Sequence, residues 1–214
     1  MVPERAYWYF DFISPFAYLA LSRVEALSSR LNLHYRPVLF AGLLRHWGHK
    51  GPAEIEAKRI WTYRWCTWLA MRQGIPFTFP AAHPFNPLPY LRIACAANSN
   101  PMVVRTLFDA LWTTGADPAA ENLALELAAR IGMDPAQPGL GQPKSVLRDH
   151  TEEAIARGVF GVPTLVLDDQ LFWGIDGMDL VEAYLLNPSI LNSAEMRRAS
   201  LLPVGVARKS PPAP

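Results

Sequence analysis

The sequence predicts an α/β fold in which two groups of strands are separated by a long helical segment. Apolar runs typical of buried strands occur near the start of the chain and again after residue 163. Between them, a capping residue followed by proline recurs and marks the start of one helix after another. Half of the 214 residues are hydrophobic, which is ample for a buried core in spite of 20 prolines.

The chain begins with a predicted strand, helix and strand. Residues 6–13 form an aromatic-rich run, which indicates a buried strand. The Ser-Pro pair at residues 14–15 predicts a helix start, and apolar residues at helical spacing continue to residue 31. Residues 33–40 predict a second strand, which Pro37 confines to a sheet edge or a bulge. A parallel βαβ unit is the economical arrangement of these elements.

The middle of the chain predicts helices and loops without a convincing strand. Five further helices are expected to begin at Pro52, Pro87, Pro101, Pro118 and Pro143 and to end near Gly74, Ala97, Thr114, Gly132 and Gly158. Trp61, Trp65 and Trp68 are spaced four and three apart, so they share one face of the first of these helices. We expect that face to pack in the core, with a pocket wall as the alternative.

Strand character returns near the end of the chain. Residues 164–168 and 171–173 predict a hairpin, and residues 178–186 predict a helix. One or two helical turns are expected around residues 194–201, before a proline-rich tail at residues 203–214 that we expect to be flexible.

A βαβ unit followed by a ββα unit is the element inventory of a thioredoxin-like domain. The predicted organisation is a discontinuous domain of this kind at residues 1–40 and 158–188, a helical insertion at residues 41–157, and a C-terminal extension at residues 189–214.

Composition excludes several classes of function. The net charge is +1, from 20 basic and 19 acidic residues, so a nucleic-acid partner is not expected. The five histidines have no metal-ligand spacing, so no metal site is predicted. No apolar run reaches the ~18 residues of a membrane span, and the N-terminus lacks a leader pattern, so the cytoplasm is the expected compartment. Cys66 and Cys95 form no CxxC pair and are expected to be inert core thiols.

Ser14 opens the first candidate site. Backbone N–H groups and the dipole at a helix N-terminus favour an anion, the serine hydroxyl adds a donor, and the same place lowers the pKa of a thiol. The alternative is that Ser14 only caps the helix. Asp11, three residues earlier, could tune this site, but we expect it to satisfy buried donors instead.

The second candidate site is Phe160–Thr164, just before the second group of strands. In a thioredoxin-like arrangement this loop faces the start of the first helix. A cis proline at residue 163 would leave the backbone of the residue before it free to pair with an extended peptide.

These segments carry a family resemblance. Residues 9–20 resemble the start of 2-hydroxychromene-2-carboxylate isomerases and kappa-class glutathione transferases, which are thioredoxin-like proteins with a helical insertion, alongside the DsbA-type oxidoreductases. Residues 158–164 look like their cis-proline loop, and residues 172–176 look like the segment that holds the glutamyl end of glutathione. The insertion is similar at residues 51–59 and 83–88, and the resemblance runs from about residue 6 to residue 186.

The resemblance implies glutathione as the cofactor. Where redox relatives have Cys-x-x-Cys, this chain has Ser14 and Ala17, so the thiol would come from glutathione and Ser14 would hold it as thiolate. The implied glutathione contacts are Ser14, Val162, Pro163, Trp173, Gly174, Ile175 and Asp176. The implied substrate is an aromatic carboxylate, with polar contacts expected from Arg45, His49, Lys50 and Asn86.

The resemblance therefore implies a glutathione-dependent isomerase that converts 2-hydroxychromene-2-carboxylate to trans-o-hydroxybenzylidenepyruvate in the breakdown of aromatic hydrocarbons. A kappa-like glutathione transferase or peroxidase is the nearest alternative, because it would use the same glutathione site. A non-catalytic, thioredoxin-like peptide-binding module is the alternative from another class. A homodimer is expected by analogy alone.

Overall fold

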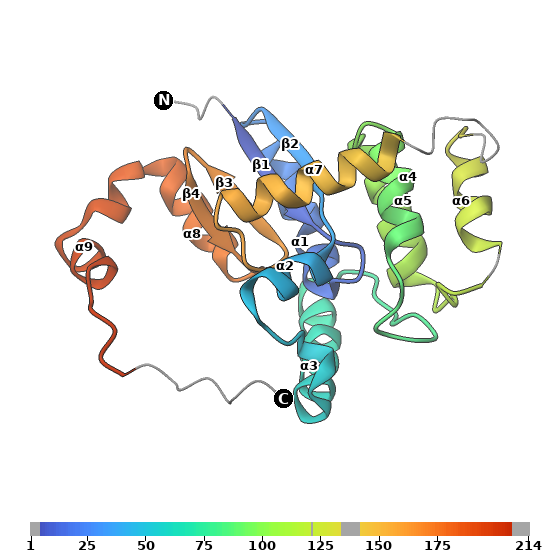
Figure 1. Ribbon diagram of the computed structural model, residues 1–214, viewed down its shortest axis with the longest axis horizontal. Coiled ribbons are helices and arrows are strands. Elements are labelled where there is room, and N and C mark those ends of the chain that lie inside the picture. Colours follow the sequence, from blue (N-terminus) through green and yellow to red (C-terminus); the bar gives the residue numbers. More distant parts are fainter. Residues whose placement is uncertain (1–4, 121, 134–141, 207–214) are drawn as a thin grey trace. The chain divides into compact units, whose positions relative to one another are not determined.

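A computed structural model describes residues 5–120, 122–133 and 142–206 (Figure 1). Its strands are β1 (Ala6–Phe10), β2 (Leu33–Pro37), β3 (Thr164–Leu167) and β4 (Gln170–Trp173). They form one sheet in the order β2-β1-β3-β4, in which β1 is parallel to β2 and antiparallel to β3, and β3 is antiparallel to β4. The sheet confirms the predicted α/β fold of the thioredoxin-like kind, and β2, which contains Pro37, is an edge strand as predicted.

Helices make up most of the remaining described chain. The α-helices are α1 (Pro15–Leu27), α2 (Phe40–Trp47), α3 (Glu56–Gln73), α4 (Leu88–Ala96), α5 (Pro101–Thr113), α6 (Leu123–Arg130), α7 (Gln142–Ala156), α8 (Gly177–Leu186) and α9 (Ala194–Ser200). Two short 3₁₀ helices, η1 (Pro52–Glu54) and η2 (Pro188–Asn192), precede α3 and α9. The chain divides into two compact units, residues 1–178 and residues 179–214.

Both faces of the sheet are covered by helices within residues 1–178. Successive side chains of β1 point to opposite faces, as strand geometry requires. Tyr7 and Tyr9 lie in one apolar cluster with residues of α2 and α7, and Figure 1 shows α7 crossing the sheet on that side. Trp8 and Phe10 instead contact Phe108 of α5, with ring centroids 6.2 and 5.6 Å apart.

The β3–β4 turn agrees with the sequence. Leu167 pairs with Gln170, so only two residues connect the strands. Asp168 and Asp169 have φ values of 46° and 64°, the left-handed conformation that a two-residue hairpin turn of the I′ type requires.

Several predicted boundaries are wrong. The first strand ends at Phe10 rather than residue 13, because Asp11 accepts the N–H of Ile13 and turns the chain. The second strand ends at Pro37, and the chain enters α2 at residue 40, a helix that the sequence did not indicate.

The start of α6 also differs from its prediction. The Asp117-Pro118 pair does not open a helix, because the Asp117 side chain accepts the N–H of Ala119 and forms a turn; α6 begins at Leu123. Most of the predicted proline-rich tail, residues 207–214, lies outside the described residues.

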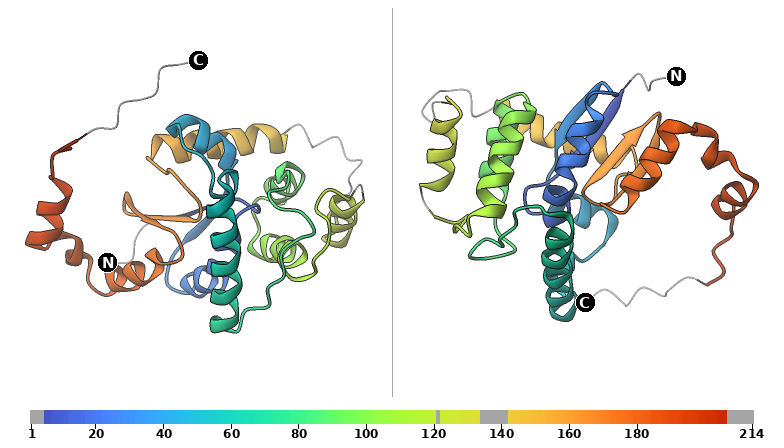
Figure 2. Two further views of the ribbon diagram at one scale, coloured as in Figure 1. Left: turned by 90° about the horizontal axis from the view of Figure 1, so that it is seen from below. Right: turned by 180° about the vertical axis from the view of Figure 1, so that it is seen from behind.

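The core position predicted for the three tryptophans is also wrong. Trp61, Trp65 and Trp68 are 65%, 38% and 46% exposed, and none of them lines the cavity beside Ser14. They stack on one another, with centroid distances of 6.2 and 5.0 Å. Figure 2 shows α3 extending away from the sheet, so only part of its surface finds a partner in the described chain. Cys66, Leu69 and Ala70 are its buried residues.

Candidate functional site

Ser14 lies at the N-terminus of α1, where β1 has ended and the turn through Asp11 has reversed the chain. Its side-chain oxygen accepts the N–H of Ala17 at 3.2 Å, and Pro15 occupies the first helical position. The predicted capping role is therefore confirmed. Ser14 is buried, with 7% of its surface exposed, and it lines a cavity.

Val162 meets Ser14 from the other half of the sheet. The Ser14 hydroxyl donates to the Val162 carbonyl oxygen over 3.4 Å, across 148 residues of sequence. That separation exceeds the ~2.5–3.0 Å of an ordinary O–H···O hydrogen bond, so a stronger acceptor would readily replace the carbonyl. The Val162–Pro163 peptide bond is cis.

The remaining predicted glutathione residues adjoin this loop. The Pro163 carbonyl accepts the N–H of Gly174 at 2.9 Å, which ties the loop to the end of β4. The Trp173 indole lies over Gly161, where a Cβ would come within 2.6 Å of Nε1. Gly174 has φ of +82° and lies against the Asp176 carboxylate. Ile175 is buried, whereas Trp173 and Asp176 are exposed to solvent.

A cavity of about 290 Å³ opens beside Ser14. Most of its lining side chains are apolar, and they come from the strand ends, the start of α1, α2, η1 and the segment before α4. The polar and charged side chains among them are Asp11, Ser14, Glu54, Thr62, Tyr63 and His83. No lysine or arginine is among the lining residues that the structure describes.

Tyr63 and His83 form a hydrogen-bonded pair in the wall of this cavity. The Tyr63 hydroxyl lies 2.7 Å from His83 Nδ1 and 2.7 Å from the His83 carbonyl oxygen. His83 Nε2 lies 2.8 Å from the carbonyl oxygen of Ile13, the residue before Ser14. A carbonyl only accepts, so Nε2 carries the proton of the neutral ring. Burial lowers the pKa of His83, which favours that neutral form.

Asp11 satisfies buried donors, as predicted. Its two carboxylate oxygens accept the N–H groups of Ile13 and Phe40 at 3.1 and 2.8 Å. The residue is fully buried, and this burial raises its pKa to about 7 in spite of the hydrogen bonds that oppose the shift. Asp11 thereby fixes the turn before Ser14 and the entry to α2.

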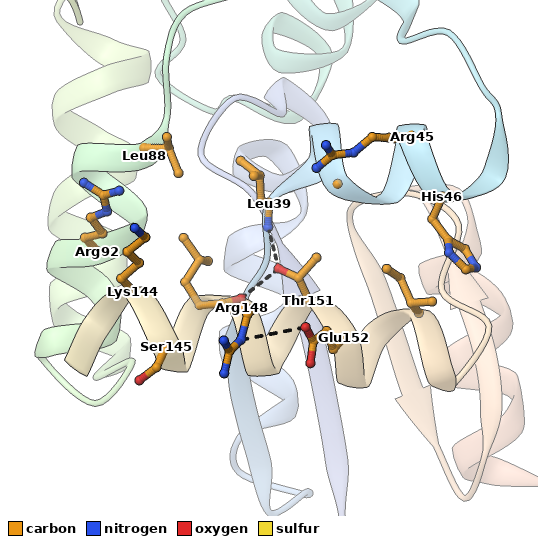
Figure 3. A pocket seen from close by; sticks show the side chains of 13 residues that line it. Leu39, Arg45, His46, Leu88, Arg92, Lys144, Ser145, Arg148, Thr151 and Glu152 are labelled. Carbon is orange, nitrogen blue, oxygen red and sulfur yellow. Dashed lines mark hydrogen bonds and ion pairs between the residues drawn. The ribbon is translucent and has the colours of Figure 1, made fainter. Parts of the chain in front are cut away.

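The four residues predicted to contact the substrate do not line this cavity. His49 and Lys50 are exposed immediately before Gly51, which does line it. Asn86 is exposed between Phe85 and Pro87, which both line it, and its side chain accepts the N–H of Leu88. Arg45 lines a separate groove between α2, α4 and α7 (Figure 3).

Both cysteines are free and buried, and burial raises the pKa of each thiol to about 12. The prediction that they are core thiols is confirmed, and neither can serve as a thiolate near neutral pH.

Sequence reasoning missed Tyr63 and Thr62 as cavity residues. Both lie between Trp61 and Trp65 on α3, and the tryptophan spacing indicated a different face of that helix. His83 occurs in a segment already noted for its resemblance, so it could have been found there.

Comparison with known proteins agrees with this geometry. The model of the DSBA-like thioredoxin domain matches residues 7–186. The chain is 31% identical to a 2-hydroxychromene-2-carboxylate isomerase from Sphingobium xenophagum over 195 aligned positions, and the match covers 84% of this chain and 97% of that protein. It is 27% identical to human glutathione S-transferase kappa 1, over 86% of this chain and 92% of that protein.

A solved structure of a 2-hydroxychromene-2-carboxylate isomerase is also similar. It superposes with a TM-score of 0.69 at 25% identity and covers 88% of this chain and 98% of that one. Within the described residues, no helix is both long and apolar enough to cross a membrane.

Proposed function

The chain belongs to the 2-hydroxychromene-2-carboxylate isomerase family, and from that premise we propose that it isomerises 2-hydroxychromene-2-carboxylate to trans-o-hydroxybenzylidenepyruvate with glutathione as its cofactor. It is an enzyme of the isomerase class. The cytoplasmic location and the homodimer stay predictions.

The residues present fit glutathione. A partly exposed path runs from Ser14 through Val162 and Pro163 to Gly174 and Asp176, each step supported by a contact described above. Val162 would pair with the peptide backbone of glutathione, and the Asp176 carboxylate would meet its ammonium group. Trp173, Gly174 and Ile175 would shape that end of the site. When bound, glutathione supplies the thiolate that adds to the substrate and later leaves.

Ser14 would hold the sulfur in its charged form. Its hydroxyl proton points at a carbonyl over a long 3.4 Å, so turning that proton toward a thiolate sacrifices little hydrogen-bond energy. The N-terminus of α1 adds a favourable dipole. No cysteine faces this site, and both thiols in the chain are buried, so the protein cannot cycle a disulfide of its own here. This fits an isomerisation without net redox change.

The cavity beside Ser14 would take the aromatic part of the substrate. Its lining is mostly apolar and its volume, about 290 Å³, suits a bicyclic molecule. The substrate carboxylate would lie at the mouth of the cavity, toward the exposed side chains of His49, Lys50 and Asn86. The Tyr63 hydroxyl, in the wall, donates its one proton to His83 and would hold that ring in place beside the substrate.

The observation that carries this proposal is the meeting of the Ser14 hydroxyl with Val162 at the wall of an apolar cavity. Purified protein would be mixed with the chromene carboxylate, with and without glutathione, and the absorbance followed. We expect turnover only when glutathione is present. Absence of turnover under both conditions, from a folded protein that binds glutathione, would contradict the isomerase assignment.

A kappa-like glutathione transferase is the second candidate. The absence of lysine and arginine from the described lining of the cavity favours an acceptor without a carboxylate. Turnover of chlorodinitrobenzene without turnover of the chromene would support this candidate. The third candidate, a peptide-binding module, would turn over neither compound. It would bind extended peptides, and its Ser14→Ala variant would bind them equally well.

A further inference from the structure

A second cavity, of about 780 Å³, lies between α2, α4 and α7. It is distinct from the cavity beside Ser14, and Leu39 is the lining residue that the two share. The Leu39 backbone is fixed there, because its N–H donates to Thr151 Oγ1 at 3.1 Å. Figure 3 shows this groove with α7 along one side, α2 opposite it, and α4 at the end where Arg92 lies. We call it the α2–α4–α7 groove.

The charges that line the α2–α4–α7 groove are mostly positive. Arg45, Arg92, Lys144 and Arg148 line it, whereas Glu152 is the one acidic residue among its described lining. Arg148 is balanced by Asp149 and Glu152, at 3.2 and 3.7 Å.

The other three cations have no ion pair with any residue in the described ranges. They come from three different helices, and Figure 3 shows Arg92 and Lys144 at the same end of the groove. Arg92 Nε is moreover buried without a hydrogen-bond partner. A buried donor on a charged group is costly when it is unsatisfied, so an anion that reached it would gain a strong, charge-assisted hydrogen bond.

Between these cations the surface is apolar. Leu39, Leu88, Leu147 and Ile155 line the groove together with Gly42. The Thr151 hydroxyl is not available to a ligand, because it donates to the Leu147 carbonyl and accepts from Leu39. Apolar walls with unpaired cations at their edge suit a molecule with a compact hydrocarbon body and an acidic group.

We propose that the α2–α4–α7 groove binds a small organic carboxylate with an apolar body. The carboxylate contacts Arg92 and Lys144, which lie at the same end of the groove, and the apolar body lies on the leucine and isoleucine side chains. The site stands on its own geometry and does not depend on the reaction at Ser14.

The test is calorimetric titration of the full chain with naphthalene-2-carboxylate, with its neutral analogue 2-naphthylmethanol and with inorganic phosphate. The carboxylate should bind, and its affinity should fall as salt is added, because the contacts are between charges. Phosphate and the alcohol should each bind at least about tenfold more weakly, because phosphate lacks the apolar body and the alcohol lacks the charge. Equal binding of the alcohol, or no binding of the carboxylate, would overturn the proposal.

Variants locate the site. Arg92→Gln and Lys144→Gln should each weaken the binding of naphthalene-2-carboxylate by about tenfold, the loss of one charge-assisted contact. Lys144 is exposed, so its variant should fold even if Arg92→Gln does not. Arg130→Gln is the matched control, because it removes one positive charge from the exposed surface of α6, outside the groove. It should leave the affinity for naphthalene-2-carboxylate unchanged. An unchanged affinity in Lys144→Gln would refute the assignment, and a loss of affinity in Ser14→Ala would place the carboxylate in the other cavity instead.

Discussion

The Ser14 hydroxyl donates to the carbonyl oxygen of Val162 over 3.4 Å while its oxygen accepts the N–H of Ala17 at 3.2 Å. One side chain thus caps α1 and reaches the loop that leads into β3. The two residues come together because β1 pairs with β3, so the end of one strand meets the start of the other. Capping and catalysis are therefore compatible roles for this side chain. The effect of a Ser14 mutation must be compared with the effect of losing a helix cap elsewhere in the chain.

Ser14→Ala should lower the isomerase activity by about 10²–10³-fold, which is typical for the removal of one donor to a developing or held charge. The stability should fall by only about 1 kcal/mol, the usual cost of a lost N-cap. Initial rates at saturating glutathione and urea unfolding measure the two effects.

Asn100→Ala is the matched control for a lost cap. The Asn100 side chain caps α5 by accepting the N–H of Met102 at 2.9 Å, and it does not line the cavity. This variant should lose comparable stability and keep its activity. If both variants lose activity equally, Ser14 acts only through the helix.

The strands of the fold could be predicted because their signals are local. An aromatic run marks β1, an aliphatic run marks β3, and a pair of aspartates marks the hairpin turn. The missed helix α2 depends instead on a distant group, since the N–H at its start is held by Asp11. The exposed tryptophans of α3 were misplaced because spacing shows that residues share a face but not whether another element covers that face.

The candidate site was predictable where it follows from chain order and less so where it follows from packing. The Ser14 and Val162 segments could be paired through a resemblance. Tyr63 enters the cavity from the middle of a helix with no motif around it, and Arg45 lines a different groove although it lies six residues before Gly51, which lines the cavity. Which side of a short helix faces a given cavity is a tertiary property.

Tyr63→Phe should reduce kcat by about tenfold, a loss of the size expected for one hydrogen bond that holds His83 in position. The hydroxyl that it removes holds His83, which in turn bonds the carbonyl before Ser14. Tyr90→Phe removes a comparable buried bond, from the Tyr90 hydroxyl to the Pro118 carbonyl at 2.7 Å, and Tyr90 lies outside the lining of the cavity. Steady-state kinetics should separate the two variants; equal kcat values in Tyr63→Phe and the parent would exclude a role for this hydroxyl.

Gly161→Ala should raise the KM for glutathione by several-fold with a smaller change in kcat. The new Cβ would come within 2.6 Å of Trp173 Nε1, so the indole must move in the region proposed to bind the glutamyl end. Gly177→Ala is the control, because its Cβ meets its nearest neighbour at an ordinary 3.4 Å. Glutathione titrations of the two variants give the comparison, and an unchanged KM in Gly161→Ala would remove Trp173 from the proposed site.

Asp11 should make the stability of the protein fall as the pH rises. Burial raises its pKa from 3.8 to about 7 in the folded state, so above about pH 4 the unfolded chain loses this proton while the folded chain keeps it. The stabilisation is complete below the unfolded pKa and is lost as the pH rises to the folded pKa, by up to about 4 kcal/mol for a shift of this size.

Asp11→Asn removes this proton equilibrium and keeps an acceptor for one of the two backbone N–H groups. The stability of Asp11→Asn also depends on the hydrogen bond that it loses. The informative quantity is therefore the difference between parent and variant in the free energy of unfolding. It is measured by urea unfolding at intervals of about one pH unit from about pH 4 to pH 9. Buried histidines contribute equally to both proteins and cancel. That difference should fall between about pH 4 and pH 7 and then level off; a constant difference would mean that Asp11 is ionised throughout the folded state in this range.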